Sequence, residues 1–176
     1  MATVVSSNIK NKVQEHRLLT LWKKWGGSVV GRRIFNLIFS RFVPYSGSIK
    51  SQIIKLEPGH VVVELKDRKS IRNHLNCIHA IALANLGELS SGLAMIAAVP
   101  SDIRAIVVNL EIEYLKKARG KLIAEGKATP PETITESVSS VAISEIKDAE
   151  NDIVARVTVH WLLSPKPDQQ RKQHHD

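Results

Sequence analysis

Residues 73–99 limit the possible folds more than any other part of the chain. Small or large apolar side chains recur there at helical spacing: Ile78, Ala82, Leu83, Leu86, Leu89, Leu93 and Met95. Few charges interrupt them. A helix that is apolar on nearly all sides offers no face to water, so other elements must bury it. The sequence therefore predicts a fold built around one central helix.

β-Branched and alternating segments before and after that helix predict strands. Residues 60–66 follow the turn signature Glu57-Pro58-Gly59 and predict the second half of a hairpin. Further strands are expected at 103–114, 121–126, 133–147 and 152–163. A curved antiparallel sheet wrapped around the helix is the economical way to bury it, so we expect an α+β fold.

The N-terminal part predicts two additional helices outside this sheet. Residues 9–25 and 29–42 carry apolar residues near a 3.6-residue period, and Gly26-Gly27 and Pro44 interrupt the pattern. We therefore expect three parts: residues 1–44 as a helical extension, 45–164 as the sheet-and-helix domain, and 165–176 as a flexible basic tail. The second helix is expected to pack on the sheet.

Composition narrows the class of protein. The net charge of +8 favours anionic partners, but nucleic acid is not expected, because the strands after Pro100 offer only Tyr114 and Trp161 for base stacking. No metal is predicted, since the histidines lack ligand spacing. The single cysteine, the absence of a signal-peptide pattern, and a longest unbroken apolar run of only residues 92–100 predict a cytoplasmic protein without a membrane span.

Polar residues at fixed spacing mark the central helix. Asn73 precedes His79 by six positions, and Glu88 follows His79 by nine. A later segment, Tyr114-Leu-Lys-Lys-Ala-Arg-Gly120, ends an alternating strand. Over residues 45–164 these motifs resemble those of the phenylacetate-type (PaaI-like) hotdog-fold acyl-CoA thioesterases. The resemblance implies the hotdog fold, in which a curved antiparallel sheet wraps a central helix.

The resemblance also implies a reaction and its residues. In that family an acyl thioester, usually of coenzyme A, binds between two subunits. The Ala80 N–H would stabilise the oxyanion at the helix start. Glu88 would act as general base or nucleophile on the thioester bound at the partner's helix start. Asn73 would orient the water or the carbonyl, and His79 would orient the turn or the sulfur end of the thioester.

We therefore predict an acyl-CoA thioesterase that hydrolyses a medium- or long-chain substrate. Coenzyme A enters as part of the substrate, and no other cofactor is expected. The family's shared site implies a homodimer, with further pairing into a tetramer as an option. A basic cluster after the third strand fits the coenzyme A phosphates, although a solvated turn explains it as well: Lys116, Lys117 and Arg119.

The key residues also have structural interpretations. Glu88 can reach solvent or an arginine at a subunit interface, Asn73 can cap the helix, and His79 can be a core histidine. Cys77 is best interpreted as a small buried apolar residue.

Departures from the family pattern favour a second hypothesis. Ala80 and Ile81 replace the family's Gly-Gly, and Asn76 replaces a further glycine. The side chain at Ile81 narrows the approach of a ligand to the backbone, because only glycine lacks a Cβ. The polar residue common on the next strand falls near Ile106 or Val107. The alternative is a non-catalytic acyl-CoA or lipid-binding hotdog protein.

The second N-terminal helix carries Phe35, Phe39 and Phe42. Besides ordinary packing, this pattern is compatible with the wall of an acyl-chain tunnel. It is also compatible with contact with an anionic membrane surface, with the arginines outward.

Overall fold

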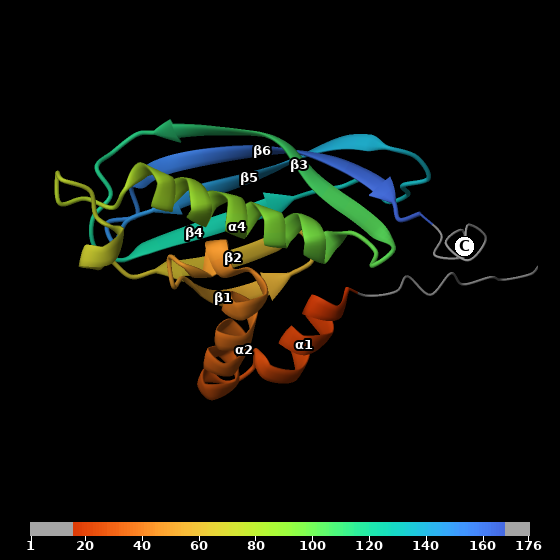
Figure 1. Cartoon of the computed structure of the whole chain (residues 1–176), viewed down its shortest axis with the longest axis horizontal. Coiled ribbons are helices and arrows are strands. Elements are labelled where there is room, and N and C mark those ends of the chain that lie inside the picture. The colour runs from red at the N-terminus through yellow and green to blue at the C-terminus, as the bar shows by residue number, and fades with distance from the viewer. Residues whose placement is uncertain (1–15, 168–176) are drawn as a thin grey trace, which may run out of the picture.

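The computed structural model describes residues 16–167. Six antiparallel strands, in the order β1-β2-β4-β5-β6-β3, wrap one long helix (Figure 1). The helices are α1 (Arg17–Trp25), α2 (Val29–Phe42), α3 (Pro44–Gly47) and α4 (Ala80–Ala98), with a 3-10 turn at Lys69–Ile71. The strands are β1 (Gln52–Glu57), β2 (His60–Leu65), β3 (Ile103–Tyr114), β4 (Leu122–Ala128), β5 (Val138–Lys147) and β6 (Ile153–Pro165). The predicted α+β hotdog arrangement is confirmed.

Helix α4 is the central helix, and the sheet covers most of it. Leu86, Ala94 and Met95 are completely inaccessible. By length and composition alone α4 would pass for a membrane span, although its longest unbroken apolar run is short. In the fold, however, 72% of this apolar segment of the helix is buried inside the protein. A helix buried to this extent is a core helix.

Small residues set the distance between α4 and the sheet. A Cβ on Gly126 of β4 would collide with the Ser90 carbonyl of α4, and a Cβ on Gly87 would collide with Val157 of β6. In the same layer the hydroxyls of Ser90 and Ser144 share a buried hydrogen bond of 2.7 Å. The backbone of α4 therefore lies directly on β4, at a separation that only glycine permits.

The two edges of the sheet differ. At β1, Ile53 N donates to Asn36 Oδ1 at 2.7 Å, and Asn36 Nδ2 donates to the Ile53 carbonyl at 3.1 Å. The Asn36 side chain of α2 thus occupies part of that edge. At the other edge, Ile106, Val107 and Val108 of β3 are exposed by 42%, 36% and 60%. An exposed apolar edge strand is a template for pairing with another chain.

The predicted boundaries differ most from the structure at two places. Helix α4 begins at Ala80 rather than at residue 73, because Asn76 has a left-handed φ of 54° that a helix does not accommodate. Strand β5 begins at Val138 rather than at residue 133. The predicted helical residues 9–15 and the tail residues 168–176 lie outside the described residues.

Gly126→Ala tests the contact between α4 and β4. Because the new Cβ meets backbone that cannot move alone, we expect a loss of roughly 1–3 kcal/mol in the free energy of unfolding. Gly27→Ala is the matched control, since a Cβ there meets nothing within 4 Å. Urea denaturation of both variants measures the difference. Equal stability of the two would contradict the described separation of helix and sheet.

Candidate active site

Asn73 organises the loop that precedes α4. Its Oδ1 accepts hydrogen bonds from Leu75 N at 2.9 Å and Cys77 N at 3.4 Å. The Cys77 thiol donates to the same oxygen at 3.3 Å and is buried. The interpretation of Asn73 as the helix N-cap is therefore wrong, because its oxygen serves the loop. Its Nδ2 group has no hydrogen-bond partner within residues 16–167.

His79 is the N-cap of α4. Its Nδ1 accepts a hydrogen bond from Ile81 N at 3.1 Å, and the residue is exposed. It is thus not a core histidine, and its ring holds the first turn of the helix. Because the cap satisfies Ile81 N, the free backbone donor at this helix start is Ala80 N–H, which has no partner among the described residues.

A cavity of about 320 Å³ opens at the N-terminus of α4. It brings together Asn73 and Ala80 with Lys116 and Lys117 from the segment after β3. The hydroxyl of Tyr114 donates to the Ala80 carbonyl at 3.1 Å, and burial raises the pKa of this phenol. Tyr114 therefore stays a neutral donor that fixes the first residue of the helix. The sequence motif included Tyr114, but its spacing did not indicate this role.

The basic residues that were predicted to bind the coenzyme A phosphates fall into two groups. The Lys116 ammonium lies 2.6 Å from Asp148, 2.7 Å from Asp152 and 3.1 Å from Glu150. These carboxylates raise the pKa of Lys116 and neutralise its charge. They also have ligand spacing for a metal ion, but the ammonium occupies their centre. The predicted phosphate role therefore does not suit Lys116.

Lys117 and Arg119 remain candidates for the phosphates. Both are exposed, and neither has an ion pair within the part of the chain that the structure describes. Lys117 lines the cavity at the start of α4. Ala118, between them, accepts a hydrogen bond from Ile78 N at 2.9 Å, which ties this segment to the loop before the helix.

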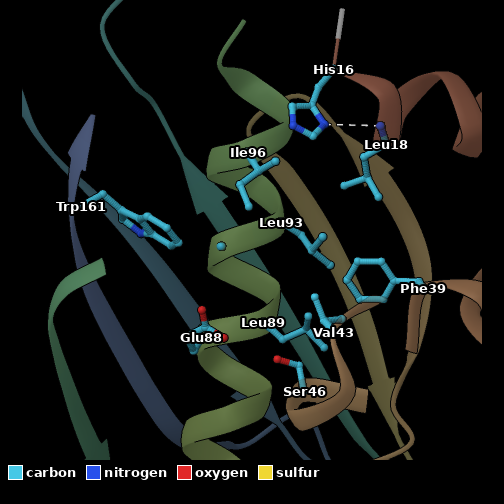
Figure 2. Close-up of a pocket in the computed structure, with 11 residues that line it drawn as sticks. His16, Leu18, Phe39, Val43, Ser46, Glu88, Leu89, Leu93, Ile96 and Trp161 are labelled. Atoms are coloured by element: carbon cyan, nitrogen blue, oxygen red, sulfur yellow. Dashed lines mark hydrogen bonds between the residues drawn. The ribbon is translucent and has the colours of Figure 1, made fainter. Parts of the chain in front are cut away.

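Glu88 lies in a different cavity, further along α4 (Figure 2). This cavity measures about 210 Å³ and is lined mainly by apolar side chains of α4, α2 and β6. Figure 2 shows Glu88 at one end of it and His16 at the other. Within residues 16–167 the Glu88 carboxylate has no hydrogen bond or ion pair, and burial raises its pKa. No arginine among these described residues pairs with Glu88, so an arginine at a subunit interface stays a prediction.

The aromatic ring of Trp161 helps to bury Glu88. A Cβ added to Gly92 would lie 3.3 Å from the Trp161 ring and 3.6 Å from Glu88 Oε1. Gly92 therefore leaves room for the indole and the carboxylate to lie on the same side of the helix. Trp161 is only 3% exposed, and its Nε1 is buried without a partner. No sequence motif indicated either Gly92 or Trp161.

The structure thus assembles the predicted residues into two separate groups. Asn73 and Ala80 share the cavity at the helix start, whereas Glu88 lines the second cavity. Ala80 and Glu88 are about 12 Å apart along the helix axis, from a rise of about 1.5 Å per residue. One chain therefore does not bring this carboxylate to its own helix start.

Comparison with known proteins gives a family for this arrangement. Residues 31–163 match a family described as a domain of unknown function, DUF4442. The chain belongs to the DUF4442 family. No curated protein shows significant sequence similarity.

Solved structures place this DUF4442 chain among hotdog proteins. A structural-genomics target is 27% identical, with a TM-score of 0.72, and the match covers 85% of this chain and 99% of the other. A hypothetical thioesterase from Streptococcus pneumoniae, solved with coenzyme A, is 22% identical, with a TM-score of 0.60 and coverage of 72% and 98%. A Streptococcus mutans protein bound to acetyl-CoA is 21% identical, with a TM-score of 0.57 and coverage of 66% and 90%. These likenesses confirm the hotdog fold.

Glu88→Gln tests the burial of an unpaired carboxylate. In the unfolded chain the Glu88 carboxyl has its ordinary pKa, and burial raises the pKa in the folded state. The stability from this group is therefore fully present below the ordinary pKa and is lost as the pH rises through the raised value. We expect Glu88→Gln to increase the free energy of unfolding near pH 8, and to change it much less near pH 4.

Urea denaturation at the two pH values measures this gain. Glu132→Gln, at an exposed position, is the control and should show no gain at either pH. A Glu88→Gln variant less stable than the native protein near pH 8 would show that the carboxylate makes a favourable contact in the folded protein.

Proposed function

We propose that the protein hydrolyses acyl-CoA thioesters at a site shared between two subunits. The observation that carries this proposal is a pair of groups on α4, the Ala80 N–H at its start and the Glu88 carboxylate, neither of which has a partner within residues 16–167. The first suits a developing oxyanion and the second suits a general base. Their separation within one chain favours a site in which each comes from a different subunit.

Coenzyme A would bind with its phosphates near Lys117 and Arg119. The thioester carbonyl would then lie in the cavity at the helix start, beside Asn73 and Ala80. The free N–H and the positive end of the α4 dipole both favour negative charge on that oxygen. The Asn73 Nδ2 group, which the loop does not use, is available to orient the water or the carbonyl. The complexes of the two streptococcal proteins with coenzyme A and acetyl-CoA support this ligand class.

Glu88 of the partner subunit would activate the water. Its carboxylate accepts a proton while the water oxygen bonds to the thioester carbon, and the Ala80 N–H stabilises the resulting oxyanion. The carbon–sulfur bond then breaks, and the thiolate of coenzyme A takes the proton from Glu88. The raised pKa of Glu88 makes it a stronger base than an ordinary glutamate. The exposed β3 edge is the natural place for the two subunits to pair.

The cavity beside Glu88 supports an acyl chain longer than acetyl. Phe39, Val43 and Leu93 contribute apolar surface to it. With the Glu88 carboxylate at one end of this apolar cavity, the reactive thioester would lie at the mouth of the cavity and the acyl chain would lie inside it. We therefore propose a medium-length acyl group as the substrate, with pairing of dimers into tetramers as a further prediction.

One observation favours the non-catalytic alternative. The cap from His79 occupies Ile81 N, so only the Ala80 N–H is left for the oxyanion at this turn. A single donor still supports turnover, but it also suits a protein that binds acyl-CoA without hydrolysing it.

Ala80→Pro tests the oxyanion donor. Proline is favoured at the first position of a helix, and the extended backbone of His79 suits a residue before proline. The variant should therefore fold normally but lose the N–H, and we expect kcat to fall roughly 100-fold or more. Ala80→Ser keeps the N–H and is the control. Hydrolysis of acyl-CoA, followed by released thiol, measures both.

Co-expression of Ala80→Pro with Glu88→Gln tests the shared site. Each variant alone should be inactive, but half of randomly mixed dimers contain both chains, and each of these has one intact site. We expect about a quarter of native activity in the mixture, since a two-fold dimer has two equivalent sites. A mixture as inactive as its parents, with mixed dimers shown by mass spectrometry, would place Glu88 and Ala80 in the same subunit's site or outside the chemistry.

Phe39→Trp tests the acyl cavity. The larger ring shortens the space available, so the chain length with the highest kcat/KM should decrease while acetyl-CoA is unaffected. Phe42→Trp is the matched control, because Phe42 is on the same helix but 78% exposed. An unchanged chain-length profile in Phe39→Trp would remove this cavity from the substrate site.

A further inference from the structure

The outer face of α2 is apolar although no part of the described chain covers it. Val30, Ile34 and Leu37 are exposed by 66%, 46% and 57%. Their spacing of four and three residues places them on one side of the helix. The opposite side carries Phe35 and Asn36, both buried against the domain. Helix α2 is therefore apolar on both sides, which is typical of a helix with a partner on each.

The neighbouring helices α1 and α3 also carry exposed apolar residues. Together the three helices hold seven of the large exposed apolar residues of the described chain, and we name these the α1–α3 surface: Leu21, Val29, Val30, Ile34, Leu37, Phe42 and Tyr45. Phe42 and Tyr45 are the most exposed of these, at 78% and 72%. Exposed apolar side chains gathered on neighbouring helices in this way mark an interaction site for another molecule.

The charge of this segment identifies the kind of partner. Residues 16–51 contain seven of the 25 basic residues and none of the 17 acidic ones. They therefore account for seven of the eight net positive charges. Arg33 and Arg41 lie on the same outer side of α2 as Leu37, by their spacing of four residues on either side of it, and both are exposed. An apolar surface with cations and no anions is complementary to a negatively charged one.

We propose that the α1–α3 surface docks onto an anionic membrane surface. Amphipathic helices with aromatic and aliphatic side chains between arginines and lysines lie in the headgroup region, where the apolar groups meet acyl chains and the cations meet lipid phosphates. A second copy of the chain is a poor occupant, since two surfaces without acidic residues would repel each other. This inference does not depend on the proposed catalytic activity.

The position of the surface is compatible with both proposed features of the active site. In Figure 1, α1 and α2 lie beside β1, whereas β3 forms the opposite edge of the sheet. Docking therefore leaves the β3 edge free for a partner subunit. The same helices supply Leu18 and Phe39 to the cavity beside Glu88, and Val43 follows at the end of α2. A docked protein would thus hold that cavity next to the lipid.

Flotation of the full chain with lipid vesicles tests the proposal. We expect binding to vesicles of phosphatidylcholine mixed with phosphatidylserine, little binding to phosphatidylcholine alone, and weakening as salt is added. Two double variants separate the contributions: Ile34→Ser with Leu37→Ser removes apolar surface, and Arg33→Glu with Arg41→Glu reverses charge. Each should lower the partition coefficient by roughly tenfold or more.

The charge-matched control is Lys127→Glu with Lys147→Glu, at positions on β4 and β5 outside the α1–α3 surface. It changes the net charge by the same amount and should bind nearly as well as the native protein. All substituted positions except Lys147 are exposed, so circular dichroism melts should confirm that each variant folds.

Three outcomes would overturn the proposal. The first is no binding to either kind of vesicle, and the second is equal loss of binding in the charge-matched control. The third is a concentration-dependent oligomer in light scattering that Ile34→Ser with Leu37→Ser abolishes, which would assign the surface to a second copy of the chain.

Discussion

The contact between α4 and the sheet is the constraint on which the rest of the structure depends. The helix lies directly against β4 and β6 because Gly126 and Gly87 leave no side chain between the two layers. In this position, the N-terminus of the helix lies where the loop around Asn73 and the segment after β3 meet at Ala80. Glu88, further along the helix, points to the side where the N-terminal helices and Trp161 enclose it.

Two charged groups near this helix lie in opposite electrostatic environments. Lys116 is surrounded by three carboxylates, so its charge is used within the protein. Glu88 has none of this support within the described residues and is partly buried among apolar groups. A buried carboxylate without a partner lowers stability, and such groups cluster at functional sites. This contrast favours a functional role for Glu88 and a structural one for Lys116.

Much of the fold could be predicted because it follows from local patterns. The all-round apolar character of residues 78–95 predicted a buried central helix, and alternation predicted the strands. The start of α4 was not predictable, because the left-handed conformation of Asn76 depends on a loop tied to Ala118, far along the chain. The cover that Asn36 provides for β1 likewise depends on how α2 packs.

The candidate site was predictable only in part. The resemblance to the PaaI-like motif identified Asn73, His79 and Glu88, but it did not show that His79 caps the helix or that Asn73 organises the loop. The carboxylate partners of Lys116 are 32 to 36 residues away in sequence. The local sequence therefore gave no sign that the Lys116 ammonium is already paired and not free to bind phosphate. The role of Trp161 at the site was not predictable, because its place beside Gly92 and Glu88 exists only after β6 packs on α4.

The most direct measurement is thiol release by the native protein from a series of acyl-CoA thioesters, from acetyl to palmitoyl. The account predicts hydrolysis with a preference for medium chains, and activity that rises with pH as the Glu88 carboxyl loses its proton. Tight binding of acyl-CoA with no thiol released at any chain length or pH would contradict it. The protein would then be a binding module in which Glu88 has no catalytic part.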